Sequence, residues 1–341
     1  MADLINKVVR FHDFGPAEVL RVEHSEVREP GPGEVRIKVA AIGLNFAETL
    51  WRRNQYFESP TLPAGLGYEA SGTIDKLGSG VTGFAVGDKV ATFPAHSQSD
   101  YPAYGEWAIM PAMSVAHYPA KLSEIEAASY STAYLTGYFA LVEIAKLASG
   151  QTILITAASS STGLAAIEIA KSVGARVIAT TRTSQKVDIL RNAGADIVVA
   201  TEEEDLVARV LDETEGNGVD VAYDAVGGKQ LSILGRIIKP CGHLILYGVR
   251  SGEDLPAPLY DLWIKSIEFH LFMMFNFTGS ESLGLTRNQA AMGRAISFIN
   301  SGIERGIFTP RVDRTFKLDE VVAAHRYMEA GNQIGKIVIT V

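Results

Sequence analysis

From about residue 150 the sequence alternates short, uninterrupted apolar runs with helix-like segments. A run that is apolar at every position is buried on both faces, which is typical of a parallel sheet covered by helices on both sides. We therefore expect an α/β domain with a doubly wound parallel sheet. The apolar runs are TILIT (152–156), RVIATT (176–181), DIVVA (196–200), VDVAYDAVG (219–227), HLILYG (243–248) and IEFHLFM (267–273), and the helix-like segments are 163–173, 184–193 and 203–214.

The first 120 residues have a different texture, with short strand-like runs separated by Gly and Pro. This pattern indicates an antiparallel, partly closed barrel. Strand-like runs return near the C-terminus, at PRVDRTFKL (310–318) and GKIVITV (335–341). We therefore expect a barrel domain built from residues 1–121 and 301–341, and a nucleotide-binding domain over 122–300.

The composition fits a cytoplasmic protein of two domains. The chain has 341 residues, 47% of them hydrophobic and 21% charged, which is enough for packed cores and argues against disorder. The sequence has no run of ~20 apolar residues for a membrane span and no apolar signal at its start. The single cysteine, Cys241, fits a reducing compartment, and we expect it to pack in the turn before a strand. A net charge of −8 disfavours a general nucleic-acid binder.

The segment ILITAASSSTGLAAIEIA (153–170) is a strand, a turn of small residues and a helix, where a dinucleotide-binding fold holds its phosphates. A G-x-G-x-x-G motif would fall on Ala158, Ser160 and Gly163, so only the third glycine is present. Backbone N–H groups and the helix dipole hold pyrophosphate, and any residue type supplies them. The residues expected to bind it are Ser159, Ser160, Ser161, Thr162 and Gly163. An ordinary turn with a serine cap stays an equal alternative for this stretch alone.

The end of the next strand favours NADPH over NADH. An NAD site places an acid ~20 residues after the glycine loop, on the ribose hydroxyl. Here ARVIATTRTSQK (175–186) contains no acid. It offers Thr181 and two cations, Arg182 for a bidentate phosphate contact and Lys186 for a point charge. The alternative is a solvated basic loop.

Nearly the whole chain resembles a known family. The segments that carry the resemblance are GLNFAETLWRRNQYF (43–57), GLGYEASGTIDKLGSGVTGFAVGDKVA (65–91), YGEWAIMPA (104–112), YLTGYFAL (134–141), GVDVAYDAVGG (218–228), GHLILYG (242–248) and GKIVITV (335–341). The chain is similar to zinc-independent medium-chain dehydrogenases/reductases of the quinone oxidoreductase-like branch. The resemblance implies a GroES-like barrel, a Rossmann domain and a homodimer formed through an edge of the nucleotide-binding domain.

The metal ligands of the related alcohol dehydrogenases are replaced. The family places a Cys, a His in GHE and a later Cys at the catalytic zinc, where this sequence has Asn45, Tyr68 and approximately Thr132. None of these is a thiolate or imidazole ligand. The cysteine-rich lobe that binds structural zinc is also missing from the sequence. We therefore expect no metal.

The resemblance implies hydride transfer from NADPH to a quinone or an α,β-unsaturated carbonyl. Such a site needs hydrogen-bond donors for the oxygen that gains charge. In the family an Asn and a Tyr face the nicotinamide and the substrate, and these are Asn45 and Tyr56 here. Tyr56 could instead simply fill the wall of the site. A related tyrosine of enoyl-thioester reductases is replaced by Leu50.

The resemblance adds five residues to the expected cofactor site beyond the loop and the second strand. Asn45 is expected to orient the cofactor as well as the substrate. The added residues are Thr132, Thr136, Tyr247, Gly248 and Lys336.

Two function classes stay open beside the reductase: an alcohol or aldehyde dehydrogenase, and a non-catalytic NADPH-binding protein with a structural or RNA-binding role.

Overall fold

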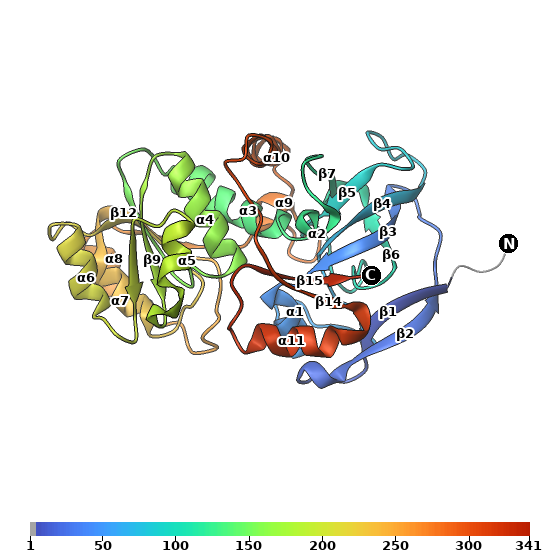
Figure 1. Ribbon diagram of the computed structural model, residues 1–341, viewed down its shortest axis with the longest axis horizontal. Coiled ribbons are helices and arrows are strands. Elements are labelled where there is room, and N and C mark those ends of the chain that lie inside the picture. Colours follow the sequence, from blue (N-terminus) through green and yellow to red (C-terminus); the bar gives the residue numbers. More distant parts are fainter. Residues whose placement is uncertain (1–4) are drawn as a thin grey trace. The chain divides into compact units, whose positions relative to one another are not determined.

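The computed structural model describes residues 5–341, which divide into two compact units (Figure 1). The barrel unit comprises the described residues up to Thr132 with Phe275–Glu304 and Thr309–Val341. The parallel-sheet unit comprises Ala133–Met274 and Arg305–Phe308. These bounds differ from the expected division at 121/122 and 300/301.

The difference has a physical cause in side-chain packing. The Phe275 ring lies 5.2 Å from the Phe57 ring and 5.8 Å from the Tyr68 ring, which ties the segment after Met274 to the barrel unit. The Ser131 hydroxyl donates to Glu69 at 2.8 Å, which ties residues 122–132 to the same unit. Such contacts between distant segments leave little trace in the hydrophobic pattern.

The barrel unit contains a seven-stranded sheet and a separate hairpin. The sheet has the order β14-β15-β3-β4-β5-β7, with β6 paired to β3. All of its pairs are antiparallel except the parallel pair β14 and β15. The strands are β1 (Ile5–Phe11), β2 (Leu20–Glu26), β3 (Glu34–Gly43), β4 (Glu69–Leu77), β5 (Lys89–Thr92), β6 (Trp107–Pro111), β7 (Val115–His117), β14 (Val312–Lys317) and β15 (Lys336–Thr340).

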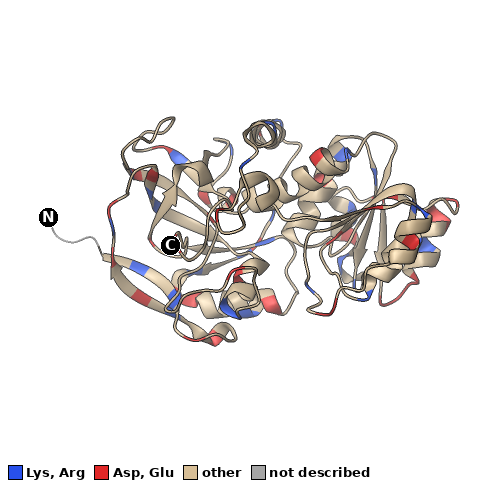
Figure 2. Cartoon of the chain, turned by 180° about the vertical axis from the view of Figure 1, so that it is seen from behind, with Lys and Arg blue, Asp and Glu red and all other residues tan. Residues whose placement is uncertain are grey.

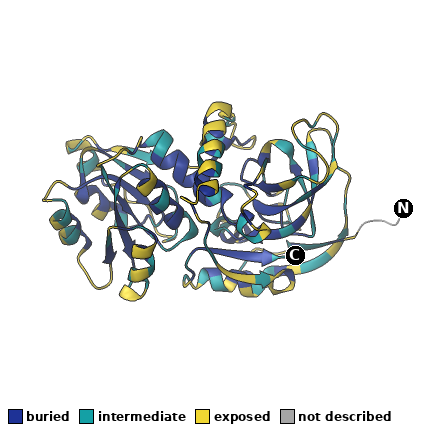
Figure 3. Cartoon of the chain, turned by 45° about the horizontal axis from the view of Figure 1, so that its top comes forward, coloured by how far each residue is buried: buried dark blue, intermediate teal, exposed yellow. Residues whose placement is uncertain are grey.

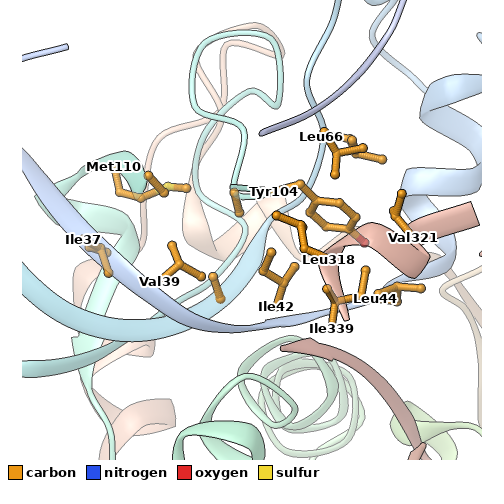
Figure 4. Packing of buried hydrophobic residues seen from close by; sticks show 14 of the residues in the cluster. Ile37, Val39, Ile42, Leu44, Leu66, Tyr104, Met110, Leu318, Val321 and Ile339 are labelled. Carbon is orange, nitrogen blue, oxygen red and sulfur yellow. The ribbon is translucent and has the colours of Figure 1, made fainter. Parts of the chain in front are cut away.

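The core of the barrel unit joins both ends of the chain. Ile37 and Ile42 of β3 pack in one cluster with Leu318, Val321 and Ile339 from the C-terminal segment (Figure 4). β15 also pairs with β3, so the last strand completes this sheet. The helical elements of the unit are η1 (Ala17–Val19), α1 (Phe46–Arg52), η2 (Ala112–Ser114), α2 (Glu124–Ala127), α9 (Phe275–Thr278), α10 (Gln289–Glu304), η5 (Leu318–Glu320) and α11 (Val321–Glu329).

The parallel-sheet unit has the strand order β10-β9-β8-β11-β12-β13. Counted from β8 this is 3-2-1-4-5-6, the order of a Rossmann fold. The order reverses between β8 and β11, and ligands of such folds bind at the carboxyl ends of strands at that point. The strands are β8 (Thr152–Ile155), β9 (Arg176–Thr181), β10 (Ile197–Ala200), β11 (Val219–Asp224), β12 (Ile238–Leu246) and β13 (Glu268–Leu271).

Helices accompany these strands as the hydrophobic pattern predicts. The strands are largely buried and the helices expose their outer faces (Figure 3). Within residues 5–341, none of the helices is both long and apolar enough to cross a membrane. The helical elements are α3 (Ser131–Tyr138), which begins in the barrel unit, η3 (Phe139–Ile144), α4 (Ser161–Ser172), η4 (Ser184–Lys186), α5 (Val187–Asn192), α6 (Leu206–Glu213), α7 (Gln230–Ile237) and α8 (Leu259–Ile264).

Two surface features bear on the sequence predictions. Cys241 is exposed, so the prediction that it packs inside is wrong. Its backbone is left-handed, with φ of 58°, and its N–H donates to the Lys265 carbonyl, so the strand bends there and turns the thiol outward. Acidic and basic residues are interspersed along the chain, as the coloured cartoon in Figure 2 shows.

Candidate active site

A buried polar network in the barrel unit joins three positions singled out in the sequence. Glu69 follows Tyr68 at the start of β4 and is fully buried. Its Oε1 accepts from the Thr132 N–H at 3.0 Å, and its Oε2 accepts from the Asn45 amide at 3.4 Å. Glu69 therefore brings together the places of the three zinc ligands of alcohol dehydrogenases.

Lys336 supplies the positive charge of this network. Its Nζ donates to Glu69 Oε2 at 2.5 Å and to Asn45 Oδ1 at 2.6 Å, and its side chain is 2% exposed. A lysine ammonium has three donors, so these two contacts leave one. The structure thus places Lys336 next to Asn45, as expected for two residues of one site. Most of the hydrogen-bonding capacity of the Lys336 ammonium is used inside the unit.

Asn45 also begins helix α1 as its N-cap residue. Its backbone N–H donates to Glu48 Oε2 at 2.5 Å, a contact of the capping-box type. Burial raises the pKa of the Glu48 carboxyl to about 8, while the Lys336 charge and the Asn45 N–H act against that rise. The Asn45 side chain is therefore held on both sides, by its place in the helix cap and by Lys336.

Aromatic rings gather next to this network. The Tyr56 ring lies 6.3 Å from Tyr68 and 4.3 Å from Phe57. The Tyr68 ring lies 5.4 Å from His96, and Phe275 contacts both Phe57 and Tyr68. Burial raises the pKa of the Tyr56 and Tyr68 phenols above their ordinary value, so both stay protonated at neutral pH.

Several buried polar atoms in this aromatic cluster lack a protein partner. Tyr68 Oη, Gln98 Nε2 and both ring nitrogens of His96 are buried and form no hydrogen bond of good geometry within residues 5–341, although the Tyr56 and Gln98 side chains lie beside the Tyr68 phenol. Burial lowers the pKa of His96 to about 3, so its ring is neutral and carries one donor and one acceptor. Buried polar groups are normally paired, so unpaired donors grouped among aromatic rings suit a bound carbonyl compound.

The sequence pointed to these residues only in part. Tyr68 was noted as the replacement of a zinc ligand, while His96 and Gln98 lie in the segment FPAHSQSDYPAYGEW (93–107) and were not selected. The spacing His-x-Gln in a loop has no motif meaning of its own. Their grouping with Tyr68 appears only once the barrel is folded.

In the parallel-sheet unit, the serine loop connects β8 to helix α4. Ser160 is the N-cap of α4, and its hydroxyl accepts from the Gly163 N–H at 3.1 Å. The Ser160 N–H in turn donates to the Ala157 carbonyl at 3.0 Å. The N–H groups of Ser161 and Thr162 belong to the first turn and have no acceptor within the helix. Among the N–H groups predicted to bind pyrophosphate, those of Ser161 and Thr162 are therefore the best candidates.

Gly163 has a packing function. A Cβ at this position would lie 2.6 Å from the Ala158 Cα and carbonyl oxygen, which are backbone atoms that cannot yield. This matches what the third glycine of a Rossmann loop does, since it lets the helix approach the strand closely. The first two glycine positions of the motif do not require glycine here, because the loop folds with Ala158 and Ser160 at those positions.

The expected basic residues lie at the end of β9. Lys186 Nζ donates to Ser159 Oγ at 3.4 Å, so the second strand's loop and the serine loop meet. Arg182 is exposed. Burial lowers the pKa of Arg250, and the nearby charge of Arg182 lowers it further. Arg250, which the sequence did not single out, therefore adds a second guanidinium to this region.

An acid from the third strand reaches the same region. Glu203 Oε1 accepts from the Ser184 N–H at 2.9 Å and from its hydroxyl at 3.2 Å. Glu203 lies beyond the segment 175–186 in the sequence, and it comes close to Ser184 because β10 lies beside β9 in the sheet. The region at the end of β9 therefore contains both basic residues and one acid, Glu203, which Ser184 holds by hydrogen bonds.

The other expected cofactor residues of this unit lie on helix α3, at the end of strand β9 and after strand β12. Thr136 is buried on α3, and Thr181 is buried at the end of β9. Tyr247 follows β12 and its ring stacks on Tyr223 at 4.0 Å. Gly248 lies close to Ala225, where a Cβ would come within 2.9 Å of the carbonyl oxygen.

The switch point itself is closed by a hydrogen bond the sequence did not predict. Thr156 Oγ1, after β8, donates to Asp224 Oδ1 at the end of β11 at 2.5 Å. Asp224 also accepts from the Gly227 N–H at 2.8 Å and from the Gln230 amide at 3.0 Å. The carboxylate is thus fully used in shaping the loops.

Comparison with known proteins agrees with this architecture. Two family models match, one described as the alcohol dehydrogenase GroES-like domain over residues 31–135 and one as zinc-binding dehydrogenase over 161–286. Quinone oxidoreductase of Pseudomonas aeruginosa is 32% identical over 333 residues, which cover 98% of this chain and 99% of that protein. 2-Haloacrylate reductase of a Burkholderia species is 29% identical, with 96% of this chain and 97% of that protein covered.

A solved structure extends the likeness to three dimensions. Escherichia coli quinone oxidoreductase complexed with NADPH superposes with a TM-score of 0.88 at 28% identity, over 98% of this chain and 100% of that chain. The barrel unit is accordingly a GroES-like domain and the parallel-sheet unit a Rossmann domain. The chain belongs to the medium-chain dehydrogenase/reductase family, in its quinone oxidoreductase-like branch.

Proposed function

We propose that this protein is an NADPH-dependent, zinc-independent oxidoreductase that reduces a quinone or an activated alkene such as an α,β-unsaturated carbonyl. Relatives named quinone oxidoreductase and 2-haloacrylate reductase, and a neighbour complexed with NADPH, support this class. The observation that carries the substrate class is the group of unpaired donors, Tyr68 Oη and Gln98 Nε2, among aromatic rings in the GroES-like domain.

The Rossmann domain has groups suited to NADPH. The first-turn N–H groups of Ser161 and Thr162 would hold the pyrophosphate. Arg182, Arg250 and Lys186 would hold the 2′-phosphate, since a doubly charged group is best stabilised by more than one cation. When bound, the cofactor supplies a hydride.

The GroES-like domain would handle the substrate oxygen. As hydride reaches the conjugated carbonyl, negative charge develops on that oxygen, and a protonated phenol can donate to it. Tyr68 meets this need because burial keeps its phenol protonated, and Tyr56 lies beside it. Asn45, held by Lys336, would orient the nicotinamide or the substrate.

Three features support independence from zinc. Asn45, Tyr68 and Thr132 offer no thiolate or imidazole, and Asn45 Oδ1 already accepts from an ammonium. A divalent ion placed among them would face the Lys336 charge at close range. An alcohol dehydrogenase, which relies on zinc to polarise the alcohol, is therefore the weaker alternative.

The test is steady-state oxidation of NADPH with a panel of quinones and enals. Wild type should turn over at least one of these acceptors. Tyr68→Phe should lower kcat/KM about tenfold or more, since it removes a donor to the developing charge. Tyr104→Phe is the matched control, because Tyr104 Oη is also buried and unpaired but lies in the aliphatic core near Leu318 and Val321 (Figure 4).

Each result decides a separate point. Equal losses in Tyr68→Phe and Tyr104→Phe would remove Tyr68 from the mechanism. Tight NADPH binding with no turnover of any acceptor would favour a non-catalytic NADPH-binding protein instead.

Chain dimerisation and a cytoplasmic location stay predictions. The exposed apolar residues on α8 and β13 support dimerisation through that edge, and they are Leu259, Tyr260, Trp263, Ile264 and Leu271.

A further inference from the structure

Two neighbouring strands of the Rossmann sheet bring three metal-ligating side chains together. His243 of β12 pairs in register with Glu268 of β13, and His270 lies two residues further along β13. Residues paired in register, and residues two apart on one strand, share a face of the sheet. His243, Glu268 and His270 therefore project from the same face, at the edge of the sheet formed by β13.

The ligand atoms of these side chains converge on one point. His243 Nδ1 lies 3.4 Å from His270 Nε2. Glu268 Oε2 lies 3.7 Å from His243 Nδ1 and 3.4 Å from His270 Nε2. Within residues 5–341, no other group of three or more His, Cys, Asp or Glu residues brings its ligand atoms this close together.

The spacings match the corners of a tetrahedron around a metal ion. With metal–ligand bonds of about 2.0–2.1 Å, neighbouring ligands of a tetrahedral ion lie roughly 3.3–3.4 Å apart, and those of an octahedral ion roughly 2.9 Å apart. The three observed separations are at or slightly above the tetrahedral value. Two imidazole nitrogens with one carboxylate oxygen are also a common donor set for zinc.

Hydrogen bonding alone explains this cluster less completely. A His–His hydrogen bond would account for one of the three contacts and would be long. It would not hold the Glu268 carboxylate, which is 62% exposed, within reach of both rings. The ordinary surface pairs of this chain, His12 with Glu23 and His117 with Asp88, each join one ring to one carboxylate at 2.6 and 2.9 Å.

We propose that His243, Glu268 and His270 form a binding site for a divalent transition-metal ion, with Zn²⁺ preferred and water as the fourth ligand. The site lies outside the residues assigned to hydride transfer, so it does not require a metal in that reaction. A bound ion would cross-link the edge strand β13 to β12. The sequence prediction of no metal rested on the zinc positions of alcohol dehydrogenases and did not consider this face of the sheet.

Zinc titration of the full-length, chelator-treated chain tests the proposal. Competition with a chromophoric chelator should show one Zn²⁺ per chain. His243→Ala and His270→Ala should each weaken Zn²⁺ by more than about tenfold, since even groups that only support a ligand contribute 10–100-fold. His117→Ala is the matched control, an exposed histidine with a carboxylate partner, and should bind Zn²⁺ as wild type does.

Two further measurements keep the test decisive. Glu268→Gln changes an exposed side chain, so it should fold even if the histidine variants do not, and it should also weaken Zn²⁺. Co²⁺ added to wild type should give the strong visible absorption of tetrahedral coordination. Failure of wild type to bind stoichiometric Zn²⁺, undiminished binding in Glu268→Gln, or a weak octahedral Co²⁺ spectrum would each overturn the proposal.

Discussion

Lys336 Nζ donates to Glu69 Oε2 at 2.5 Å with both side chains almost fully buried. Removing one partner of a buried ion pair leaves the other charge without compensation, which costs about 3–5 kcal/mol. We therefore expect Lys336→Met to lower the free energy of unfolding of the GroES-like domain by that amount. Urea unfolding followed by fluorescence measures the change.

The control for this variant is Lys7→Met. Lys7 pairs with Asp319 at 2.6 Å on the surface, where such pairs contribute about 0–1 kcal/mol. A loss in Lys336→Met no larger than in Lys7→Met would show that the buried pair does not stabilise the domain.

Cofactor preference depends on Arg182. Arg182→Ala removes a charge-assisted contact of about 1.5–3 kcal/mol, so NADPH should bind roughly ten- to a hundredfold more weakly while NADH hardly changes. Ser160→Asp should weaken both cofactors by placing a negative charge at the start of α4. Fluorescence titration of both cofactors checks each variant, with Arg191→Ala on α5 as the surface control. Equal affinity of wild type for NADH and NADPH would contradict the prediction from the second strand.

Glu48 should make stability depend on pH. Burial raises the pKa of its carboxyl to about 8 in the folded chain, above its value of about 4.3 in an unfolded chain. The unfolded state therefore ionises first, and this contribution to stability is full below pH 4.3 and is lost as pH rises toward 8. We expect Glu48→Gln to flatten that decline, by a few kcal/mol at most.

Denaturant unfolding of wild type and variant from pH 5 to 8 measures this effect. Glu126→Gln is the control, since Glu126 closes the same type of cap on α2, with its side chain only partly buried. Parallel curves for wild type and Glu48→Gln would show that the carboxyl titrates normally.

Reduction of quinones or enals should proceed without metal. Treatment with a strong chelator should leave the rate of NADPH oxidation unchanged, because Asn45, Tyr68 and Thr132 give zinc no suitable ligands. The His243 cluster would lose any ion in the same treatment, so an unchanged rate also separates that cluster from the reaction. Recovery of a lost rate on adding Zn²⁺ would contradict this prediction.

The edge strand β13 should join two chains. Light scattering at micromolar concentration should give the mass of a dimer. Leu271→Lys places a charge on the exposed edge and should shift the protein toward monomer, since charged edge strands resist pairing. A monomeric wild type would contradict the prediction that this chain forms the dimer expected from its family.

The strands of the Rossmann domain could be predicted closely because they are short, mostly apolar runs separated by helix-like segments. RVIATT (176–181) coincides with β9, and TILIT (152–156) covers the whole of β8. The hairpin of β1 and β2 was missed because its burial alternates irregularly. Segment 275–300 was assigned to the nucleotide-binding domain, since a helix pattern alone does not say which core the helix covers.

Site residues that belong to a sequence motif could be predicted. Site residues that come together only when separate strands or loops pack could not. Asn45 and Lys336 came from separate motifs, and the structure joins them by a hydrogen bond. Glu203, Arg250 and His96 were missed because their closeness to other site residues depends on the order of strands and on loop paths. His243 and His270 were not predicted as a group, because they come together only through the pairing of β12 with β13.

The pairing of β15 with β3 has a consequence for how the chain folds during synthesis. The edge of β3 that β15 occupies stays unpaired until residues 336–340 have been made. Glu69 must wait as well, because its cationic partner Lys336 lies on that last strand. The Rossmann segment, whose strands are all local, can form earlier. A nascent chain therefore carries an open sheet edge and a buried acid without its cation until β15 has been made.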